Sequence, residues 1–250
     1  MNERSAAVVT IGTELVLGEV ENTNLTWLCG TLTRLGMNVV WAATVPDEVE
    51  MIRECIRVSR AATDVIVVSG GLGGTPDDVT REGIARAFGV ALRTDERIVE
   101  ELRTAPGEHI LTFADVWSRI PDGARPLFGA VGGVPGFALE NVYVLPGMPP
   151  EMREMFGQIE PELGRGPELH TWSKTLPTSE HLILSCLEEL AEKHPDVGCG
   201  SYPRFSDAAS PEVKIVLRAR SRDDLSAAAR VVERFARTLG SEGVASGPTG

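Results

Sequence analysis

Over the first 160 residues, short runs of consecutive apolar residues alternate with segments in which apolar residues recur every three or four positions. The runs predict buried strands over residues 6–11, 39–45, 64–69 and 141–145. The periodic segments predict helices between these strands. This alternation is typical of an α/β fold with three layers, in which helices cover both faces of a mostly parallel sheet.

Several of the predicted helices begin at a recognisable signal. Asn22 or Thr23 can cap the first helix, in which every third or fourth residue is a leucine. Asp47 and Glu50 have the spacing of a capping box for the second helix. Further helices are expected over residues 78–88, over 113–120 in a stretch of weak pattern, and from the prolines at 149 and 150 onward.

A segment rich in proline and glycine, residues 161–167, is the expected linker between two domains. We place the first domain at 1–163, the second at 168–241 and a frayed tail at 242–250. Two adjacent strands between two helices indicate that the second domain is a small α+β unit with an antiparallel pair. Its elements are expected over residues 171–176 (strand), 179–193 (helix), 197–202 (strand), 213–219 (strand) and 222–239 (helix).

The 250 residues carry a formal net charge of −12, and 42% of them are hydrophobic. An acidic surface repels phosphate backbones, so no nucleic-acid partner is expected. No apolar run approaches the roughly 20 residues that cross a bilayer, and the short polar start does not resemble a signal peptide. We therefore expect a cytoplasmic protein without membrane contact. The cysteines and histidines are dispersed, so no His/Cys metal cluster is expected.

The sharpest chemical signal is the segment Ser69-Gly70-Gly71-Leu72-Gly73-Gly74-Thr75-Pro76-Asp77-Asp78-Val79-Thr80, which joins a predicted strand to a predicted helix. Glycines at such a place let backbone N–H groups approach an anion, and the helix N-terminus adds partial positive charge. Asp77 and Asp78 would repel a bare phosphate, and a divalent cation that bridges a pyrophosphate would remove this conflict. The alternative is that the two aspartates only cap the helix.

Three segments of the chain together resemble a known family. The glycine-rich segment resembles the GGLGPTxDD signature of molybdopterin-binding domains, of the N-terminal domain of competence-and-damage-inducible protein A (CinA) and of a domain in some FAD synthases. Residues 11–18 with 22–24 are similar to the family's GTELLLG and NTN segments, and residues 145–152 to its LPGVPxEM segment. The three matches occur in order across about 140 residues.

The resemblance implies a ligand site built from these three segments. Glu14 could orient a ligand hydroxyl, and Asn24 could bind the polar edge of a ring. Helix capping is the alternative for Asn22 and Asn24, and dipole stabilisation is the alternative for Glu151. Two sets of residues are implied: Asp77 and Asp78 for catalysis and metal binding, and, for ligand and phosphate contact, Gly12, Thr13, Glu14, Asn24, Gly70, Gly71, Gly73, Gly74, Thr75, Gly147 and Glu151.

The remainder of the chain both extends this resemblance and departs from it. Residues 200–205 and 213–219 are similar to the family's small KH-like second domain. We find no GxxG loop between paired helices and no basic face there, so we expect this domain to pack or dimerise instead of binding RNA, and expect a homo-oligomer. Gly74 replaces the family's proline, which would loosen the phosphate loop. The chain ends before the family's C-terminal amidohydrolase domain, so nicotinamide-mononucleotide deamidation is not expected.

The resemblance implies alternative functions for the first domain. One is a metal-dependent pyrophosphatase that cleaves ADP-ribose or a related dinucleotide, with Mg²⁺, Mn²⁺ or Co²⁺ as its cofactor. Another is a module of the molybdenum-cofactor type, which binds molybdopterin or transfers a nucleotidyl group to it. A third is a ligand-binding module without catalytic activity. One fold can host all of these, so the expected partner is a small nucleotide or pterin phosphate.

Overall fold

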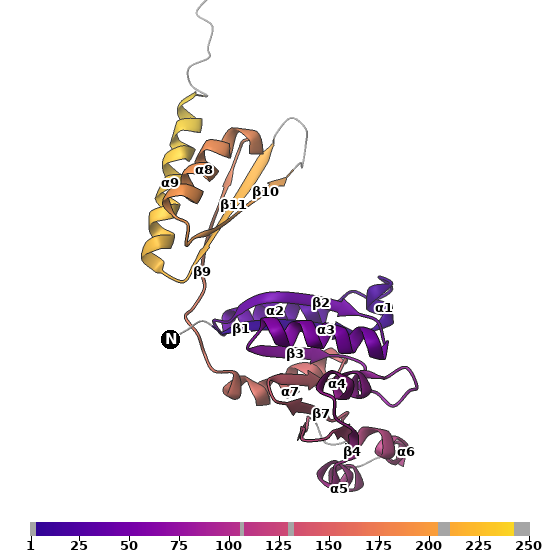
Figure 1. Ribbon diagram of the computed structural model, residues 1–250. Helices are drawn as coiled ribbons and strands as arrows, with labels where there is room; N and C mark the ends of the chain where they lie inside the picture. The colour runs from indigo at the N-terminus through magenta and orange to yellow at the C-terminus, as the bar shows by residue number, and fades with distance from the viewer. Residues whose placement is uncertain (1–3, 106–107, 130–132, 205–210, 243–250) are drawn as a thin grey trace, which may run out of the picture. The chain divides into compact units, whose positions relative to one another are not determined.

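The structure, a computed structural model, describes residues 4–105, 108–129, 133–204 and 211–242 of the chain (Figure 1). The chain forms two compact units, Met1–Pro167 and Glu168–Gly250. Within the described ranges, no helix is both long enough and apolar enough to cross a membrane.

A six-stranded sheet forms the centre of the first unit. Its strands are β1 (Ser5–Ile11), β2 (Asn38–Val45), β3 (Val65–Ser69), β6 (Arg125–Leu127), β7 (Gly136–Leu139) and β8 (Val142–Leu145). Their order across the sheet is β2-β1-β3-β8-β7-β6. Strands β2, β1, β3 and β8 run parallel, whereas β7 and β6 are each antiparallel to their neighbour. The prediction of a mostly parallel sheet is confirmed.

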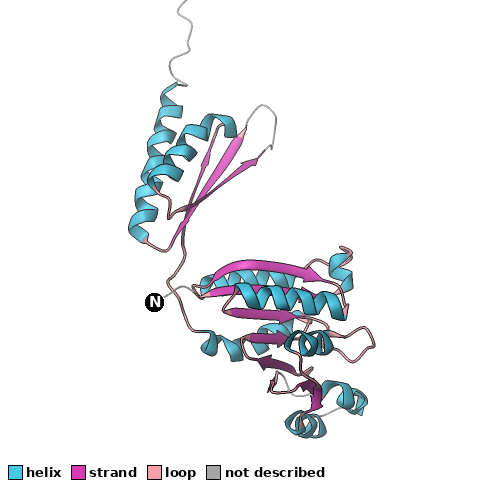
Figure 2. Cartoon of the chain, viewed as in Figure 1, coloured by secondary structure: helices cyan, strands magenta, loops and turns pink. Residues whose placement is uncertain are grey.

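Helices cover both faces of this sheet (Figure 2). The helices of the first unit are α1 (Thr13–Val16), α2 (Thr23–Arg34), α3 (Val49–Ala62), α4 (Thr80–Phe88), α5 (Glu96–Thr104), α6 (Glu108–Trp117) and α7 (Pro149–Leu163). Successive side chains of a strand point to opposite faces, so β1 contributes to two cores. Ala6 and Val8 pack in a core with α2 and α7. Ala7 and Val9 pack in the core with α3 and α4. The expected three-layer arrangement is confirmed.

The start of α2 follows the sequence signals, whereas α6 and α7 differ from the expected elements. The Asn22 side chain caps α2 by accepting a hydrogen bond from the Leu25 amide at 3.0 Å. The short helix expected over 113–120 is wrong at its end, because residues 119–121 form strand β5 (Arg119–Pro121), which pairs with β4 (Leu92–Thr94). The linker also begins later than expected, because α7 includes Pro161 and continues to the buried Leu163.

In the second unit, helices cover one face of a three-stranded antiparallel sheet (Figure 2). Its elements are β9 (His170–Leu176), the 3-10 turn η1 (Glu180–Ile183), α8 (Leu184–Lys193), β10 (Gly198–Arg204), β11 (Glu212–Ala219) and α9 (Arg222–Glu242). The strand order is β10-β11-β9, so the predicted antiparallel pair is present and β9 completes the sheet. Of the tail expected at 242–250, Glu242 ends α9 and the other residues lie outside the described ranges.

Candidate functional site

The carboxyl ends of four parallel strands position one cleft. The chain leaves these strands at Ile11, Val45, Ser69 and Leu145. In open parallel sheets, ligands bind in the crevice outside the carboxyl ends of the strands. The cleft here has a volume of about 390 Å³ and is lined by residues from all four strand ends or the loops that follow them. The three sequence segments singled out above therefore meet at one place.

Nine of the predicted site residues line this cleft. They are Gly12, Glu14, Gly70, Gly71, Gly73, Asp77, Asp78, Gly147 and Glu151. Asn24 lines a narrower pocket of about 130 Å³, which shares Glu14, Gly70 and Gly147 with the cleft. The other three, Thr13, Gly74 and Thr75, are not among the residues that line the two spaces. Thr13 and Thr75 form hydrogen bonds to Asp47 and Asp78, which do line the cleft.

The turn after β3 requires glycine for two separate reasons. Gly70 and Gly71 have φ angles of 111° and 64°, which side-chain-bearing residues rarely adopt. A Cβ on Gly70 would lie 2.1 Å from the Ile11 carbonyl oxygen, and one on Gly71 would lie 2.1 Å from Thr80 Oγ1. The buried Thr80 hydroxyl donates to the Gly70 carbonyl at 2.9 Å, which ties the start of α4 to the turn.

Asp78 braces the glycine-rich loop and does not cap α4. Its Oδ1 accepts from the Gly73 amide at 2.8 Å, and its Oδ2 accepts from the Thr75 amide at 2.9 Å and the Thr75 hydroxyl at 2.5 Å. The helix begins only at Thr80, with Val79 at its N-cap and no side-chain cap. The prediction that Asp77 or Asp78 caps this helix is therefore wrong. The predicted start of α4 at residue 78 is also wrong by two residues.

Asp77 faces the same cleft and is exposed. Interaction with the Thr75 side chain, and with its own backbone amide, lowers the pKa of Asp77 below its ordinary value. The carboxylate is therefore ionised at neutral pH, and its exposure leaves it accessible to a ligand.

Asp47 is a site residue that the sequence interpretation assigned to helix capping. Its Oδ2 accepts from the Thr13 amide at 2.7 Å and from the Thr13 hydroxyl at 3.1 Å, and it lines the cleft. The expected capping box with Glu50 is wrong, because Glu48 occupies the N-cap of α3 and no side chain caps that helix. Asp47 follows soon after strand β2, which ends at the cleft, and this position was the sequence signal that could have identified Asp47.

Asn24 connects two of the strand ends and does not cap α2. Its Nδ2 donates to Ser69 Oγ at 3.1 Å and to the Gly147 carbonyl at 2.7 Å. Its Oδ1 is buried and has no hydrogen-bond partner among the described residues. A buried acceptor without a partner is costly, and a ligand N–H donor would satisfy it.

Glu151 also carries an unsatisfied oxygen at the cleft. Its Oε2 is buried without a hydrogen-bond partner in the described part of the chain. Burial raises the pKa of Glu151, and the nearby Glu154 carboxylate raises it further. A bound cation or a ligand hydroxyl would compensate this unfavourable environment.

The loop at Gly74 packs against an aromatic side chain. The ring of Phe113 in α6 lies against Gly74, where a Cβ would approach its Cδ1 to 2.1 Å. That ring stacks on Trp117, with 5.3 Å between centroids and 21° between planes. Phe113 therefore fills the space beside Gly74, and the expectation that glycine at this position loosens the loop stays a prediction.

The cleft is strongly acidic. Five carboxylates line it, from Glu14, Asp47, Asp77, Asp78 and Glu151, and no lysine, arginine or histidine is among the described residues that do so. A phosphate would be repelled by these groups unless a divalent cation accompanied it. In the described part of the chain no three such side chains already form a metal-binding cluster. Mg²⁺ is commonly held by only one or two carboxylates together with substrate phosphates, a mode that this donor set fits.

Comparisons with known families match both units of the chain. A family model described as "Probable molybdopterin binding domain" matches residues 7–165. A second model, described as "FAD synthase, middle domain", matches residues 168–241. The first match covers the sheet, both helical layers and the cleft.

Individual proteins support the same assignment. A protein of Archaeoglobus fulgidus is 36% identical over 198 residues, which are 79% of this chain and 85% of the relative. A CinA-like protein of Frankia casuarinae is 32% identical over 260 residues, covering 97% of this chain and 60% of the relative. The crystal structure of CinA from Thermoplasma acidophilum, titled as a protein of unknown function, has 33% identity and a TM-score of 0.59, covering 65% of this chain and 99% of that one.

Proposed function

Because the chain belongs to the CinA N-terminal family of molybdopterin-binding-type domains, we propose that its first unit hydrolyses the phosphoanhydride bond of a dinucleotide such as ADP-ribose. The observation that carries this proposal is the combination of a glycine-rich turn with five carboxylates in one cleft. The turn offers backbone amides to a phosphate, whereas the carboxylates demand a cation between them and that phosphate.

Asp77 and Asp47 are the residues best placed to hold a divalent cation such as Mg²⁺, Mn²⁺ or Co²⁺. Both line the cleft, and Asp77 is exposed. Asp78 is less suited than the sequence suggested, because three hydrogen bonds occupy three of the four lone-pair positions of its carboxylate. When bound, the cation would polarise the phosphoryl oxygens and lower the pKa of a water molecule.

The glycine-rich loop would orient the phosphates. The amides of Gly71 and Leu72, two residues that line the cleft, have no acceptor among the described residues, whereas Asp78 occupies those of Gly73 and Thr75. Hydrogen bonds from such free amides are worth most where charge develops during the reaction. Hydrolysis adds one water across the phosphoanhydride, so ADP-ribose gives AMP and ribose 5-phosphate.

A second candidate function is the binding or adenylation of a pterin phosphate. The family model for the first unit is described as a molybdopterin-binding domain, and the pocket at Asn24 offers a buried oxygen without a partner. A ring amine, in adenine or in a pterin, would satisfy that oxygen. This feature supports a nitrogen-bearing ring as part of the ligand for either function.

Product analysis tests both candidates. The purified chain is incubated with ADP-ribose, NAD, FAD or molybdopterin-AMP, each with Mg²⁺, Mn²⁺ or Co²⁺, and the products are separated by chromatography. AMP formed from ADP-ribose supports the pyrophosphatase, and adenylate exchange with the pterin supports the alternative. Tight binding with every metal but no turnover would contradict both enzymatic functions.

Two substitutions at the start of α3 provide a matched pair for this assay. Asp47→Asn removes a carboxylate of the cleft and should abolish metal-dependent turnover. Glu48→Gln changes the next residue, whose exposed side chain does not line the cleft, and should keep activity. Equal activity in the two variants would refute the metal role of Asp47.

A further inference from the structure

Arg81 is a buried charged residue beside the glycine-rich loop. It belongs to the first turn of α4 and is only 4% exposed. Its Nη1 donates a long hydrogen bond, 3.4 Å, to the carbonyl oxygen of Gly73. Its Nε and Nη2 are buried and have no hydrogen-bond partner among the described residues. The guanidinium thus lies against the loop with most of its hydrogen-bonding capacity unused.

This environment is unfavourable for a guanidinium. Burial lowers the pKa of Arg81 to about 10, although the negative charge of Asp78 acts in the opposite direction. The group is still protonated at neutral pH, so the chain keeps a buried positive charge without full compensation. A buried charge whose hydrogen-bonding groups mostly lack partners opposes folding, because its lost hydration is not replaced. The folded state alone therefore gives no reason for an arginine here.

The charge distribution around the cleft provides a reason for a buried arginine at position 81. Five carboxylates line the cleft, and no cationic side chain does so in the part of the chain that the structure describes. Arg81 lies beside the glycine-rich loop, in contact with Gly73. Asp78, the acidic neighbour of Arg81, is also the residue that holds the loop amides of Gly73 and Thr75 in place.

We propose that Arg81 is a positioning residue of the phosphate site, a fixed buried positive charge that balances Asp78 and favours an anion at the loop. This inference rests on the proposed function only in requiring that the loop binds a phosphate with a metal ion. It adds a residue that neither contacts the ligand nor lines the cleft.

The proposal predicts opposite effects on anion and cation binding. Arg81→Met removes the charge and keeps a long apolar side chain, so the potential in the cleft becomes more negative. Binding of inorganic pyrophosphate with Mg²⁺ should weaken by about tenfold, because solvent screens a buried charge only weakly and its loss disfavours an anion at the loop. Binding of Mn²⁺ alone should become tighter. Calorimetry measures the first affinity and electron paramagnetic resonance the second.

A purely structural role would give a different pattern. If Arg81 only held the loop together, Arg81→Met would weaken the binding of both probes and would lower the melting temperature. We expect the melting temperature to stay unchanged or to rise. Unchanged pyrophosphate affinity in the variant, or weaker Mn²⁺ binding, would overturn the proposal. A wild-type chain that bound no pyrophosphate with any metal would overturn the proposed function as well, so the two failures are distinguishable.

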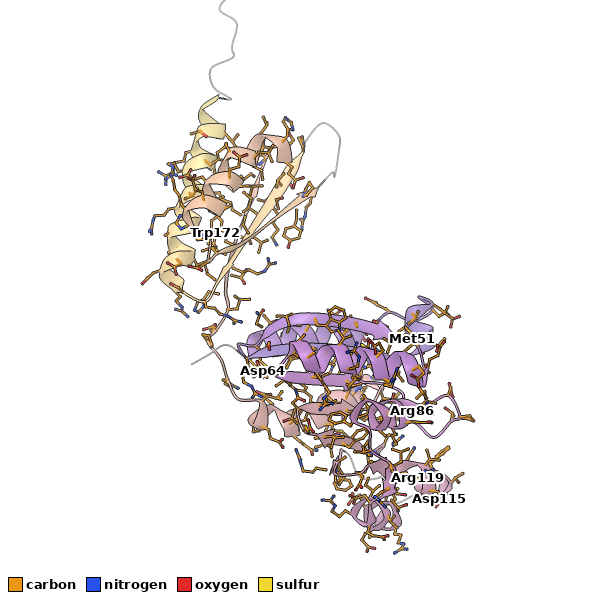
Figure 3. The ribbon with its side chains drawn as sticks, viewed as in Figure 1. Met51, Asp64, Arg86, Asp115, Arg119 and Trp172 are labelled. Atoms are coloured by element: carbon orange, nitrogen blue, oxygen red, sulfur yellow. The ribbon has the colours of Figure 1, made fainter. Side chains whose placement is uncertain are left out.

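Two further variants complete the test. Arg86→Met removes the same charge from the same helix (Figure 3). Arg86, however, is half exposed and pairs with Glu50 and Glu82. Solvent screens such a group, so pyrophosphate affinity should change less than twofold. Arg81→Lys keeps the charge without the planar fork and should retain more affinity than Arg81→Met. Equal losses in Arg81→Lys and Arg81→Met would show that shape, not charge, is what matters.

Discussion

Asp77 and Asp78 are adjacent in the chain, yet the structure predicts that their asparagine variants fail in different ways. Asp78 accepts three hydrogen bonds, at 2.8, 2.9 and 2.5 Å, within the loop between β3 and α4. Asp77 projects its exposed carboxylate into the cleft. One residue organises the loop, and the other is available to a cation.

The magnitude for Asp78→Asn follows from these contacts. A hydrogen bond to a charged group contributes about 1.5–3 kcal/mol, and asparagine retains only one oxygen while its amide faces a backbone donor. We expect a loss of about 3 kcal/mol in the free energy of unfolding, because the loop joins two elements of the core. For a unit of this size, that corresponds to a melting temperature lower by roughly 6–12 °C.

Asp77→Asn should leave the melting temperature within about 1 °C of the wild-type value, as most exposed substitutions do. It should nevertheless abolish metal-dependent hydrolysis of ADP-ribose. Differential scanning calorimetry and product chromatography on both variants separate the two effects. Equal loss of stability in the two variants would refute the division of roles, as would full activity in Asp77→Asn.

Three further predictions concern the same cleft. Gly70→Ala should lower both stability and pyrophosphate affinity, because a Cβ would lie 2.1 Å from the Ile11 carbonyl oxygen, and calorimetry should show both losses together. Gly74→Ala should destabilise the protein by about 1–3 kcal/mol, because the added Cβ would overlap the Phe113 ring. In a double-mutant cycle, the variant that carries both Gly74→Ala and Phe113→Ala should lose less stability than the sum of the losses in the two single variants. Glu151→Gln should raise the melting temperature at pH 7–8, because the folded state disfavours the ionised carboxylate. This gain in melting temperature should shrink as the pH falls through the raised pKa of Glu151, and it should vanish below about pH 4, where the carboxyl is protonated in both the folded and the unfolded state. A gain that persisted below that pH would contradict this explanation.

The sequence predicted the fold well because hydrophobic periodicity reports burial directly. The apolar run of β3 is buried along its whole length. The leucines at 28, 32 and 35, in α2 and at its C-terminal end, lie in the core that α2 shares with α7. The predicted starts of helices were less accurate where an acidic side chain had two possible partners. Asp47 and Asp78 both satisfy the sequence rule for a helix cap. In the folded chain, however, Asp47 accepts hydrogen bonds from Thr13, and Asp78 accepts them from the glycine-rich loop.

The sequence predicted many of the residues that line the cleft, but not how they interact; their functional roles stay predictions. The glycine-rich turn and Asp77 were identified because glycine and acidic residues between a strand and a helix suggest a phosphate site. Arg81 carried no such signal, since arginine in a first helical turn usually faces solvent. Its burial depends on the packing of α4 beneath the loop, which local sequence does not reveal.

The contact between Gly74 and Phe113 links two positions that are 39 residues apart in the chain. An aromatic ring at 113 and a side chain at 74 compete for one volume, so evolution can fill it from either position but not from both. Relatives that carry proline at 74 should therefore have a smaller residue at 113. Two lineages could thus reach equally rigid loops by alternative packing, and the exchange between them would require a coordinated pair of substitutions.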